Sequence, residues 1–442
     1  MYKPSNYNFI WPLSEEERFL VYNSFTTACV CTNRSGVAIL TSTVIDTEEL
    51  DYQDKDIVSE FIKNGLLIEE EIDERKVLHF SSNSYKYNKD VLSLTIASTM
   101  ACNFRCEYCY QEPGKQVIMS KEVQDGIIHY IENSIKKLDE LYITWFGGEP
   151  LLAKDIILEL SERIDQIRKV HDCKVSYLMI TNGSLFDPQL ISELKKHNYK
   201  GIQITLDGPP SIHNKRRKPK NGDAHCFEHI LDNVKELIRN GMKVMIRVNL
   251  DKTNADSMEE LLDILKEAGV TEAVIDPAQV VSYTEACKSV SGNCFHTAEY
   301  AEQESRIHRL LMEKGFVRDD TCFLPKRKTN FCCADQINSF LIDPQGNMYK
   351  CWNDIGTRET VGNIINMKSS KLQKMRQVSW IDYSPFDYQD CVECKYLPLC
   401  MGGCPYMGMV INHGKPECLK TKYNLQQIIL SHYESRKNKA EK

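Results

Sequence analysis

The sequence lacks the features that mark membrane, secreted and nucleic-acid-binding proteins. No run of about 18 or more apolar residues occurs in the chain, so no membrane span is expected. The first residues, MYKPSNYNFIWPLSEEERF, do not contain the apolar core of a signal peptide. The formal net charge of −7 provides no electrostatic basis for binding nucleic acid. We therefore expect a cytoplasmic protein that works without a membrane or a nucleic acid.

Cysteine, in contrast, is abundant, with 18 cysteines among 442 residues. Without an export signal the chain is expected in a reducing compartment, where disulfides are rare and clustered cysteines bind metals. The length exceeds that of a usual single core and predicts two or three domains. The hydrophobic share of 42% and the charged share of 26% are typical of globular proteins. Metal-bound thiolates would make the protein sensitive to oxygen.

Three cysteines lie close together in ACNFRCEYCY, at residues 101–110. Cys102, Cys106 and Cys109 have the spacing CxxxCxxC. Three thiolates do not complete a tetrahedral zinc site, and a four-iron cluster normally takes one thiolate per iron. The motif therefore leaves an open metal position, where a small molecule can be activated, or a distant fourth ligand. A structural zinc knuckle is the alternative.

Strands and helices alternate from Val91 onward. The predicted strands are 91–98, 141–146, 175–181, 202–206, 243–250 and 272–277, and helices lie between them, the first capped by Ser120. Six β/α units argue for a parallel sheet with outer helices. We predict an α/β fold, a curved partial (β/α)6 TIM-like barrel over residues 91–280. Ligands of such folds bind at the C-terminal ends of the strands, where the cysteine motif lies.

The cysteine motif with the aromatic Tyr110 resembles the signature of the radical SAM superfamily. The resemblance implies that the three cysteines hold a [4Fe-4S] cluster whose open iron binds S-adenosylmethionine (SAM). Other strand ends are similar to family positions around SAM, although each alone is typical of an ordinary turn or a surface arginine. The implied cofactor-binding residues are Tyr110, Gly147, Gly148, Glu149, Thr181, Asn182, Thr205, Asp207, Arg247 and Asn249; His213 and Arg217 lie in a further loop that matches the family.

A second group of cysteines begins at Cys333 and ends at Cys418. Its spacing resembles the SPASM domain of peptide-modifying radical SAM enzymes, and a two-zinc ribbon is the alternative. The resemblance implies two auxiliary [4Fe-4S] clusters. The first would be held by Cys333, Cys351 and Cys404, and the second by Cys391, Cys394, Cys400 and Cys418. The fourth ligand of the first is Cys332, Cys322 or an open position. Residues 340–351 are expected to form a hairpin.

Residues 1–90 precede this pattern. We predict strands at 18–25 and 36–40 around a turn at 33–36, a helix at 54–65 and a hairpin at 66–80. Together they suggest a winged-helix-like module, and an extension that caps the next domain is the alternative. Cys29 and Cys31 alternate on a strand and are expected to be small core residues.

The combination resembles maturases of ribosomally made peptides, of the sactipeptide or ranthipeptide type. The domains expected are a leader-recognition module (1–90), a radical SAM barrel (91–280), a bridge (281–330) and a SPASM domain (331–442). The implied enzyme abstracts a hydrogen atom from a precursor peptide and forms a cross-link, a thioether or a carbon–carbon bond. A leader-bearing peptide and an electron donor such as flavodoxin or ferredoxin are the implied partners. The alternatives are an anaerobic sulfatase-maturing enzyme and a non-catalytic iron–sulfur or zinc scaffold that binds peptides.

Overall fold

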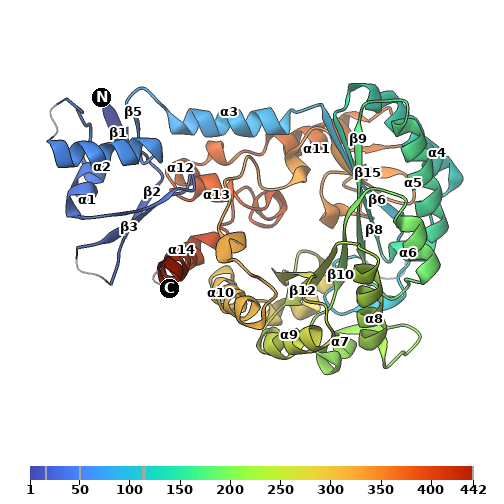
Figure 1. The fold of residues 1–442 in the computed structure, drawn as a ribbon. Coiled ribbons are helices and arrows are strands. Elements are labelled where there is room, and N and C mark those ends of the chain that lie inside the picture. The colour runs from blue at the N-terminus through green and yellow to red at the C-terminus, as the bar shows by residue number, and fades with distance from the viewer. Residues whose placement is uncertain (15–16, 49–50, 112–115, 441–442) are drawn as a thin grey trace. The chain divides into compact units, whose positions relative to one another are not determined.

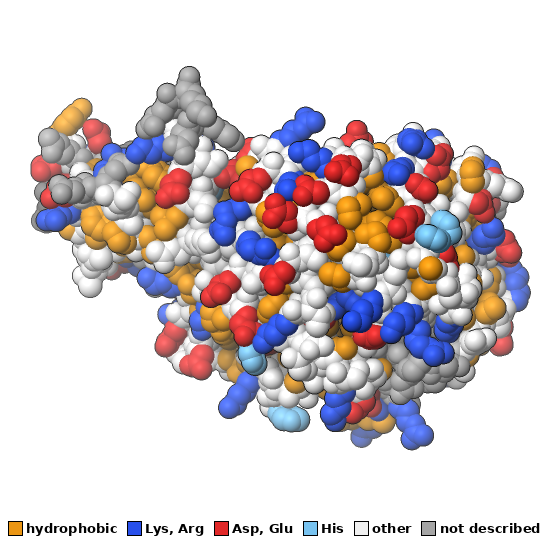
Figure 2. Space-filling model, turned by 90° about the horizontal axis from the view of Figure 1, so that it is seen from below, with side chains coloured by type: hydrophobic (Ala, Val, Ile, Leu, Met, Phe, Trp, Pro, Cys, Tyr) orange, Lys and Arg blue, Asp and Glu red, His pale blue; other side chains and the backbone are white. Residues whose placement is uncertain are grey.

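The computed structural model describes residues 1–14, 17–48, 51–111 and 116–440. The chain forms two compact units, each built from separate segments. The first unit comprises Met1–Lys86, Asp319–Cys332 and Tyr383–Lys442, and the second comprises Tyr87–Arg318 and Cys333–Asp382. No helix within the described ranges is long and apolar enough to cross a membrane. Acidic and basic side chains are interspersed on the face drawn in Figure 2.

A nine-stranded sheet is the centre of the second unit. Six of its strands lie side by side in chain order and are all parallel. They are β6 (Val91–Thr99), β8 (Glu140–Gly147), β9 (Lys174–Thr181), β10 (Tyr199–Thr205), β12 (Val244–Leu250) and β13 (Val274–Gln279). The prediction of six parallel strands is confirmed, and the mostly parallel sheet defines an α/β fold.

Helices follow these strands and cover the sheet (Figure 1). They are α4 (Lys121–Ser134), α5 (Lys154–Arg168), α6 (Pro188–Leu194), α7 (Pro210–Arg216), α8 (Cys226–Arg239), α9 (Met258–Glu267) and α10 (Thr297–Lys314). Ser120 caps α4 as predicted, because its side chain accepts a hydrogen bond from the Val123 amide. Strand side chains such as Leu94, Ile143 and Ile246 are fully buried beneath the helices, which explains the apolar runs in the sequence.

Three short strands extend the sheet beyond β6. Strand β14 (Ser339–Ile342) is parallel to β6, and β15 (Asn347–Tyr349) and β16 (Gly362–Asn363) follow it in antiparallel pairs. The predicted hairpin at 340–351 is confirmed by the β14–β15 pair. Helix α11 (Lys371–Asp382) completes this segment. A separate pair, β7 (Phe104–Cys106) with β11 (Arg217–Pro219), joins the cysteine motif to the chain after α7.

The first unit contains two small sheets. Strand β1 (Tyr2–Pro4) pairs with β5 (Leu67–Glu69), and β2 (Asn8–Pro12), β3 (Phe19–Asn23) and β4 (Cys29–Thr32) form an antiparallel sheet. Its helices are α1 (Arg34–Thr41), α2 (Tyr52–Lys63), α3 (Glu74–Lys86), α12 (Gln389–Val392), α13 (Leu397–Cys400) and α14 (Thr421–Ala440). Cys29 is exposed and Cys31 is only partly buried, so the prediction that both are small core residues is wrong.

Two predictions of secondary structure within residues 1–90 are also wrong. The segment at 36–40 is helix α1 rather than a strand, because Asn33 caps the helix by accepting from the Gly36 amide at 3.0 Å. The segment at 66–80 is not a hairpin, since β5 ends at Glu69 and helix α3 begins at Glu74. Tertiary contacts favour this helix, because Glu74 and Leu78 are buried on one side of it.

The N-terminal strands share a hydrophobic core with the C-terminal segment of the same unit. Phe9, Leu20 and Tyr22 pack in one cluster with Leu399, Leu425 and Ile429. Hydrogen bonds reinforce this packing at Lys395, whose Nζ donates to the Asn8 carbonyl at 2.9 Å and whose carbonyl accepts from Ser24 Oγ at 2.5 Å. Residues 1–86 and 383–442 are therefore parts of one folding unit.

Candidate functional site

The three clustered cysteines lie in the loop that leaves the C-terminal end of β6. Cys106 is the last residue of β7 and pairs with Arg217 of β11. Asn103 ties the loop to the end of β9, because its side chain accepts from Asn182 Nδ2 at 2.7 Å and donates to Ser184 Oγ at 2.9 Å. The loop is thus held at the sheet edge where ligands of parallel α/β folds bind.

The surroundings of the three thiols fit a bound iron–sulfur cluster. Burial raises the pKa of all three, that of Cys106 to about 12, and the positive Arg217 lowers each of them. Backbone amides point at two of the sulfurs, from Phe104 to Cys102 at 3.4 Å and from Gln111 to Cys109. Amide donors and a nearby cation stabilise thiolates, which is the form that binds metal.

Across the ranges that the structure describes, no three His, Cys, Asp or Glu side chains are grouped as ligands of one metal ion. A zinc site needs its ligands around one point, whereas a four-iron cluster binds its thiolates at separate irons. The zinc knuckle stays an alternative to the cluster at these three cysteines.

Gly147 and Gly148 allow the end of β8 to lie against the start of the cysteine loop. The amide of Gly148 donates to the Thr99 carbonyl at 3.0 Å, and that of Glu149 donates to the Ala101 carbonyl at 2.8 Å. A Cβ added at Gly148 would clash with the Ala101 carbonyl and lie 2.7 Å from the Met100 carbonyl oxygen. Gly147 has a φ of 131°, which favours glycine. Both glycines are thus required by backbone packing.

We expect the Gly148→Ala substitution to lower SAM cleavage by about 100-fold, since the added Cβ would displace the cysteine loop and small misplacements in active sites have effects of this size. Production of 5′-deoxyadenosine under dithionite, together with iron content, measures the effect. Gly292→Ala is the matched control because a Cβ there meets no atom within 4 Å. Equal rates in the two variants would contradict the expectation.

Glu149 is buried and connects the ends of two strands, β8 and β9. Its carboxylate accepts from Thr181 Oγ1 at 2.7 Å, the Asn182 amide at 2.7 Å and the Leu151 amide at 3.1 Å. Burial raises the pKa of Glu149, and these hydrogen bonds lower it. Because both of its oxygens accept hydrogen bonds from the protein, the carboxylate holds the ends of β8 and β9 together.

Asp207 and Asn249 meet at Tyr108, an aromatic residue inside the cysteine motif. The Tyr108 hydroxyl donates to Asp207 Oδ2 and accepts from Arg217 Nη1 at 2.5 Å and from Asn249 Nδ2 at 3.2 Å. The Asn249 amide in turn donates to Asp207 Oδ1 at 2.9 Å. These groups join the cysteine loop to the ends of β10 and β12. Sequence reasoning missed Tyr108, although an aromatic residue between two of the cysteines was a visible signal.

Tyr110, the aromatic residue singled out from the sequence, lies in a different environment. It packs against an apolar cluster that includes Ala97, Phe146 and Tyr349. Burial raises its pKa, and thiolates at Cys109 and Cys351 raise it further, so both cysteines lie near its hydroxyl. Tyr110 therefore links the first cysteine motif to Cys351 within the second unit.

The remaining predicted positions lie along β10 and β12. Thr205 is buried and pairs in register with Arg247. Arg247 donates to Asp276 of β13 at 2.7 Å and to Asn249 Oδ1 at 3.2 Å, and about a third of its side chain is exposed. His213 is fully buried, and burial together with Arg217 lowers its pKa, so its imidazole is neutral. The guanidinium of Arg247 is thus paired within the protein.

Comparison with known proteins identifies the family to which the domain with the three-cysteine loop belongs. Residues 96–268 match the profile of the Radical SAM superfamily. This chain contains a radical SAM domain. The match covers the cysteine loop and the strands β8, β9, β10 and β12, and it confirms the prediction of a radical SAM enzyme. Members of this superfamily use a [4Fe-4S] cluster and SAM.

Similar proteins extend the likeness beyond this domain. The radical SAM cyclopropyl synthase TigE of Paramaledivibacter caminithermalis is 23% identical over 397 residues, which cover 81% of this chain and 77% of TigE. The structure of native anSMEcpe with bound AdoMet and Kp18Cys peptide gives a TM-score of 0.62 at 20% identity and covers 78% of this chain and 99% of that one. The structure of Streptococcus suis SuiB bound to precursor peptide SuiA gives a TM-score of 0.54 at 13% identity, covering 95% and 99%. At these identities, the structures establish a shared fold.

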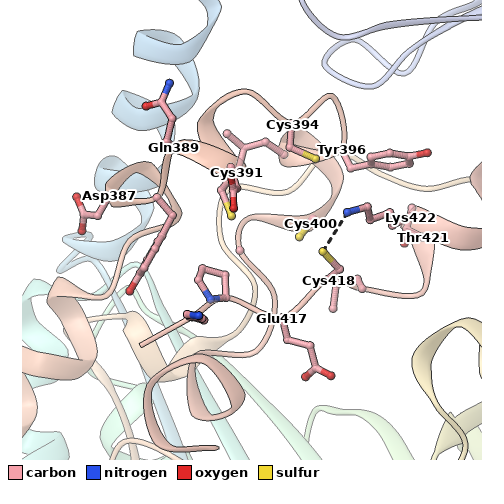
Figure 3. A pocket seen from close by; sticks show the side chains of 17 residues that line it. Asp387, Gln389, Cys391, Cys394, Tyr396, Cys400, Glu417, Cys418, Thr421 and Lys422 are labelled. Carbon is pink, nitrogen blue, oxygen red and sulfur yellow. Dashed lines mark hydrogen bonds between the residues drawn. The ribbon is translucent and has the colours of Figure 1, made fainter. Parts of the chain in front are cut away.

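Four of the later cysteines surround one cavity of the first unit (Figure 3). Cys391, Cys394, Cys400 and Cys418 line a space of about 650 Å³. Burial raises the pKa of the Cys391 thiol to about 11, and the amide of Gly402 donates to Cys400. Lys422 Nζ donates to Cys418 Sγ at 3.4 Å. Four thiols around one cavity match the donor set of a [4Fe-4S] cluster.

The other cysteines of the second group belong to different units. Cys333 and Cys351 lie in the second unit, whereas Cys404, Cys332 and Cys322 lie in the first. Amides of Tyr406 and Met407 donate to Cys404, which favours its thiolate. The ligand set of the first auxiliary cluster, with Cys332, Cys322 or an open position as its fourth ligand, stays a prediction.

Proposed function

We propose that this protein is a radical SAM peptide maturase that installs a thioether cross-link in a ribosomally made precursor peptide. The observation that carries the proposal is the extent of the likeness to SuiB. The match to SuiB covers 95% of this chain, so it must include most of the module at residues 1–90. The match to anSMEcpe covers only 78% of this chain. SuiB is bound to a precursor peptide in that structure.

In this proposal Cys102, Cys106 and Cys109 hold the cluster that binds SAM. When bound, the cluster and SAM supply a 5′-deoxyadenosyl radical that abstracts a hydrogen atom. Glu149 and the two glycines before it keep the strand ends against the cysteine loop, and Tyr108, Asp207 and Asn249 join that loop to the ends of β10 and β12. The protein contributes position and exclusion of water.

Thioether formation is an oxidation of the peptide. A C–H and an S–H bond break, and a C–S bond forms. One hydrogen atom leaves as part of 5′-deoxyadenosine and the thiol loses a proton, so one electron remains to be taken up. We assign that electron to auxiliary [4Fe-4S] clusters, one held by Cys391, Cys394, Cys400 and Cys418 and one by Cys333, Cys351 and Cys404. A flavodoxin or ferredoxin would supply the electron that starts each turnover.

The N-terminal module is proposed to bind the leader of the precursor by strand addition. Its antiparallel sheet has β2 and β4 at its edges, and such edges can accept another strand. Residues 29–32 of β4 present a short, partly exposed strand for this purpose.

The test is incubation of the full chain with SAM, dithionite and each cysteine-containing peptide that short open reading frames beside its gene prove to encode. Mass spectrometry should find a product that has lost two hydrogens, dependent on SAM. A peptide in which a cysteine loses sulfur and gains oxygen would instead identify the alternative, a sulfatase-maturing enzyme. Absence of 5′-deoxyadenosine from every incubation would leave only the non-catalytic scaffold.

A further inference from the structure

Lys422 lines the cavity formed by Cys391, Cys394, Cys400 and Cys418, and Lys328 lies beside the helix that ends at Cys400. Lys422 is in the first turn of α14, and its Nζ lies 3.4 Å from Cys418 Sγ, as the dashed line in Figure 3 marks. It follows Cys418 by four residues, across the short non-helical segment that leads into α14. The contact combines a positive charge with an N–H···S hydrogen bond.

Lys328 approaches the same cysteines from another segment. Its backbone amide donates to the Pro398 carbonyl at 2.9 Å, which places it beside α13 and therefore beside Cys400. Its Nζ lies 5.0 Å from the Phe331 ring, so the ammonium is partly removed from water.

We propose that Lys422, assisted by Lys328, raises the reduction potential of the cluster held by Cys391, Cys394, Cys400 and Cys418 and so prepares it to accept an electron. The inference rests on the proposed function, because it requires a cluster at these cysteines. Reduction adds a negative charge to the cluster. Nearby positive charge and hydrogen bonds to its sulfurs stabilise that reduced state. Lys422 and Lys328 are positioning residues, since they act through the cluster.

The test uses the full chain carrying Cys102→Ala, Cys106→Ala and Cys109→Ala, so that auxiliary clusters alone contribute signals. After anaerobic reconstitution, an EPR-monitored redox titration measures their midpoint potentials. Lys422→Met should move one signal to a more negative potential, and Lys422→Arg should restore it. Lys328→Met should move the same signal in the same direction. Lys326→Met is the control for Lys328, because Lys326 lies on the same segment with its side chain exposed.

Lys415→Met separates the hydrogen bond from the general effect of charge, because Lys415 also lines the cavity. The proposal is supported if Lys422→Met shifts the potential more than Lys415→Met, and it is overturned if the two shifts are equal or if Lys422→Met leaves the potential unchanged. Should Lys422→Met lose iron, Lys422→Gln keeps a donor without the charge, and an unshifted potential there also overturns the proposal. If adding Cys394→Ala to the triple alanine variant removes no EPR signal, these cysteines hold no cluster. That outcome contradicts the proposed function rather than the role of Lys422.

Discussion

Replacing Cys102, Cys106 and Cys109 together by alanine is expected to abolish SAM cleavage while iron stays bound at the C-terminal cysteines. The three thiols lie in one loop at the end of β6, and Arg217 and two backbone amides stabilise their ionised forms. Only this motif has three closely spaced thiols at the strand ends, so it alone is expected to leave an iron open for SAM. Formation of 5′-deoxyadenosine under dithionite and the iron content per chain measure the two parts of the result.

Cys173→Ala is the matched control. Cys173 is buried just before β9 and is not part of either cysteine group, so its loss should leave both SAM cleavage and iron content near those of the parent. Continued formation of 5′-deoxyadenosine by the triple variant would show that SAM is bound elsewhere. Loss of all iron would show that the two cysteine groups are not independent.

Deleting residues 1–86 is expected to remove iron from the C-terminal cysteines as well as any leader binding. The deletion takes Phe9, Leu20 and Tyr22 out of a core that they share with α13 and α14. Truncating one large buried side chain typically costs about 2–5 kcal/mol, and folded proteins have a margin of only about 5–15 kcal/mol. Loss of the whole segment should therefore unfold the unit that carries Cys391 and Cys418.

A milder version of this experiment uses Leu20→Ala, which should lower the free energy of unfolding of this unit by about 2–5 kcal/mol. Leu20 is 1% exposed, whereas Tyr52 is 81% exposed on helix α2 and provides the control, Tyr52→Ala, with an expected change within about 0.5 kcal/mol. Denaturant unfolding followed by near-UV circular dichroism, with iron content in parallel, measures both. Equal stabilities would contradict the shared core.

Local patterns predicted the six parallel strands but misjudged parts of the N-terminal module. The six parallel strands carry buried apolar side chains at alternate positions or more, as β12 shows, and they appear in the sequence as apolar runs. Ser120 caps its helix through a contact three residues away. At Asn33 the same kind of local contact was ambiguous, because asparagine begins turns and helices alike. Helix α3 has few apolar residues, and its burial through Leu78 depends on Leu397 and Met401, far away in sequence.

The sequence by itself determined the cysteine spacing, the radical SAM domain and the order of its parallel strands, because these depend on short motifs and on periodicities within single elements. The tertiary structure decided which groups meet. It placed Tyr108, and not Tyr110, against Asp207 and Asn249, and it paired Arg247 with Asp276 across neighbouring strands. It also joined residues 1–86 to the C-terminal cysteines through Lys395 and a common core. Such contacts are set by how distant segments pack, and no local periodicity in the chain records that packing.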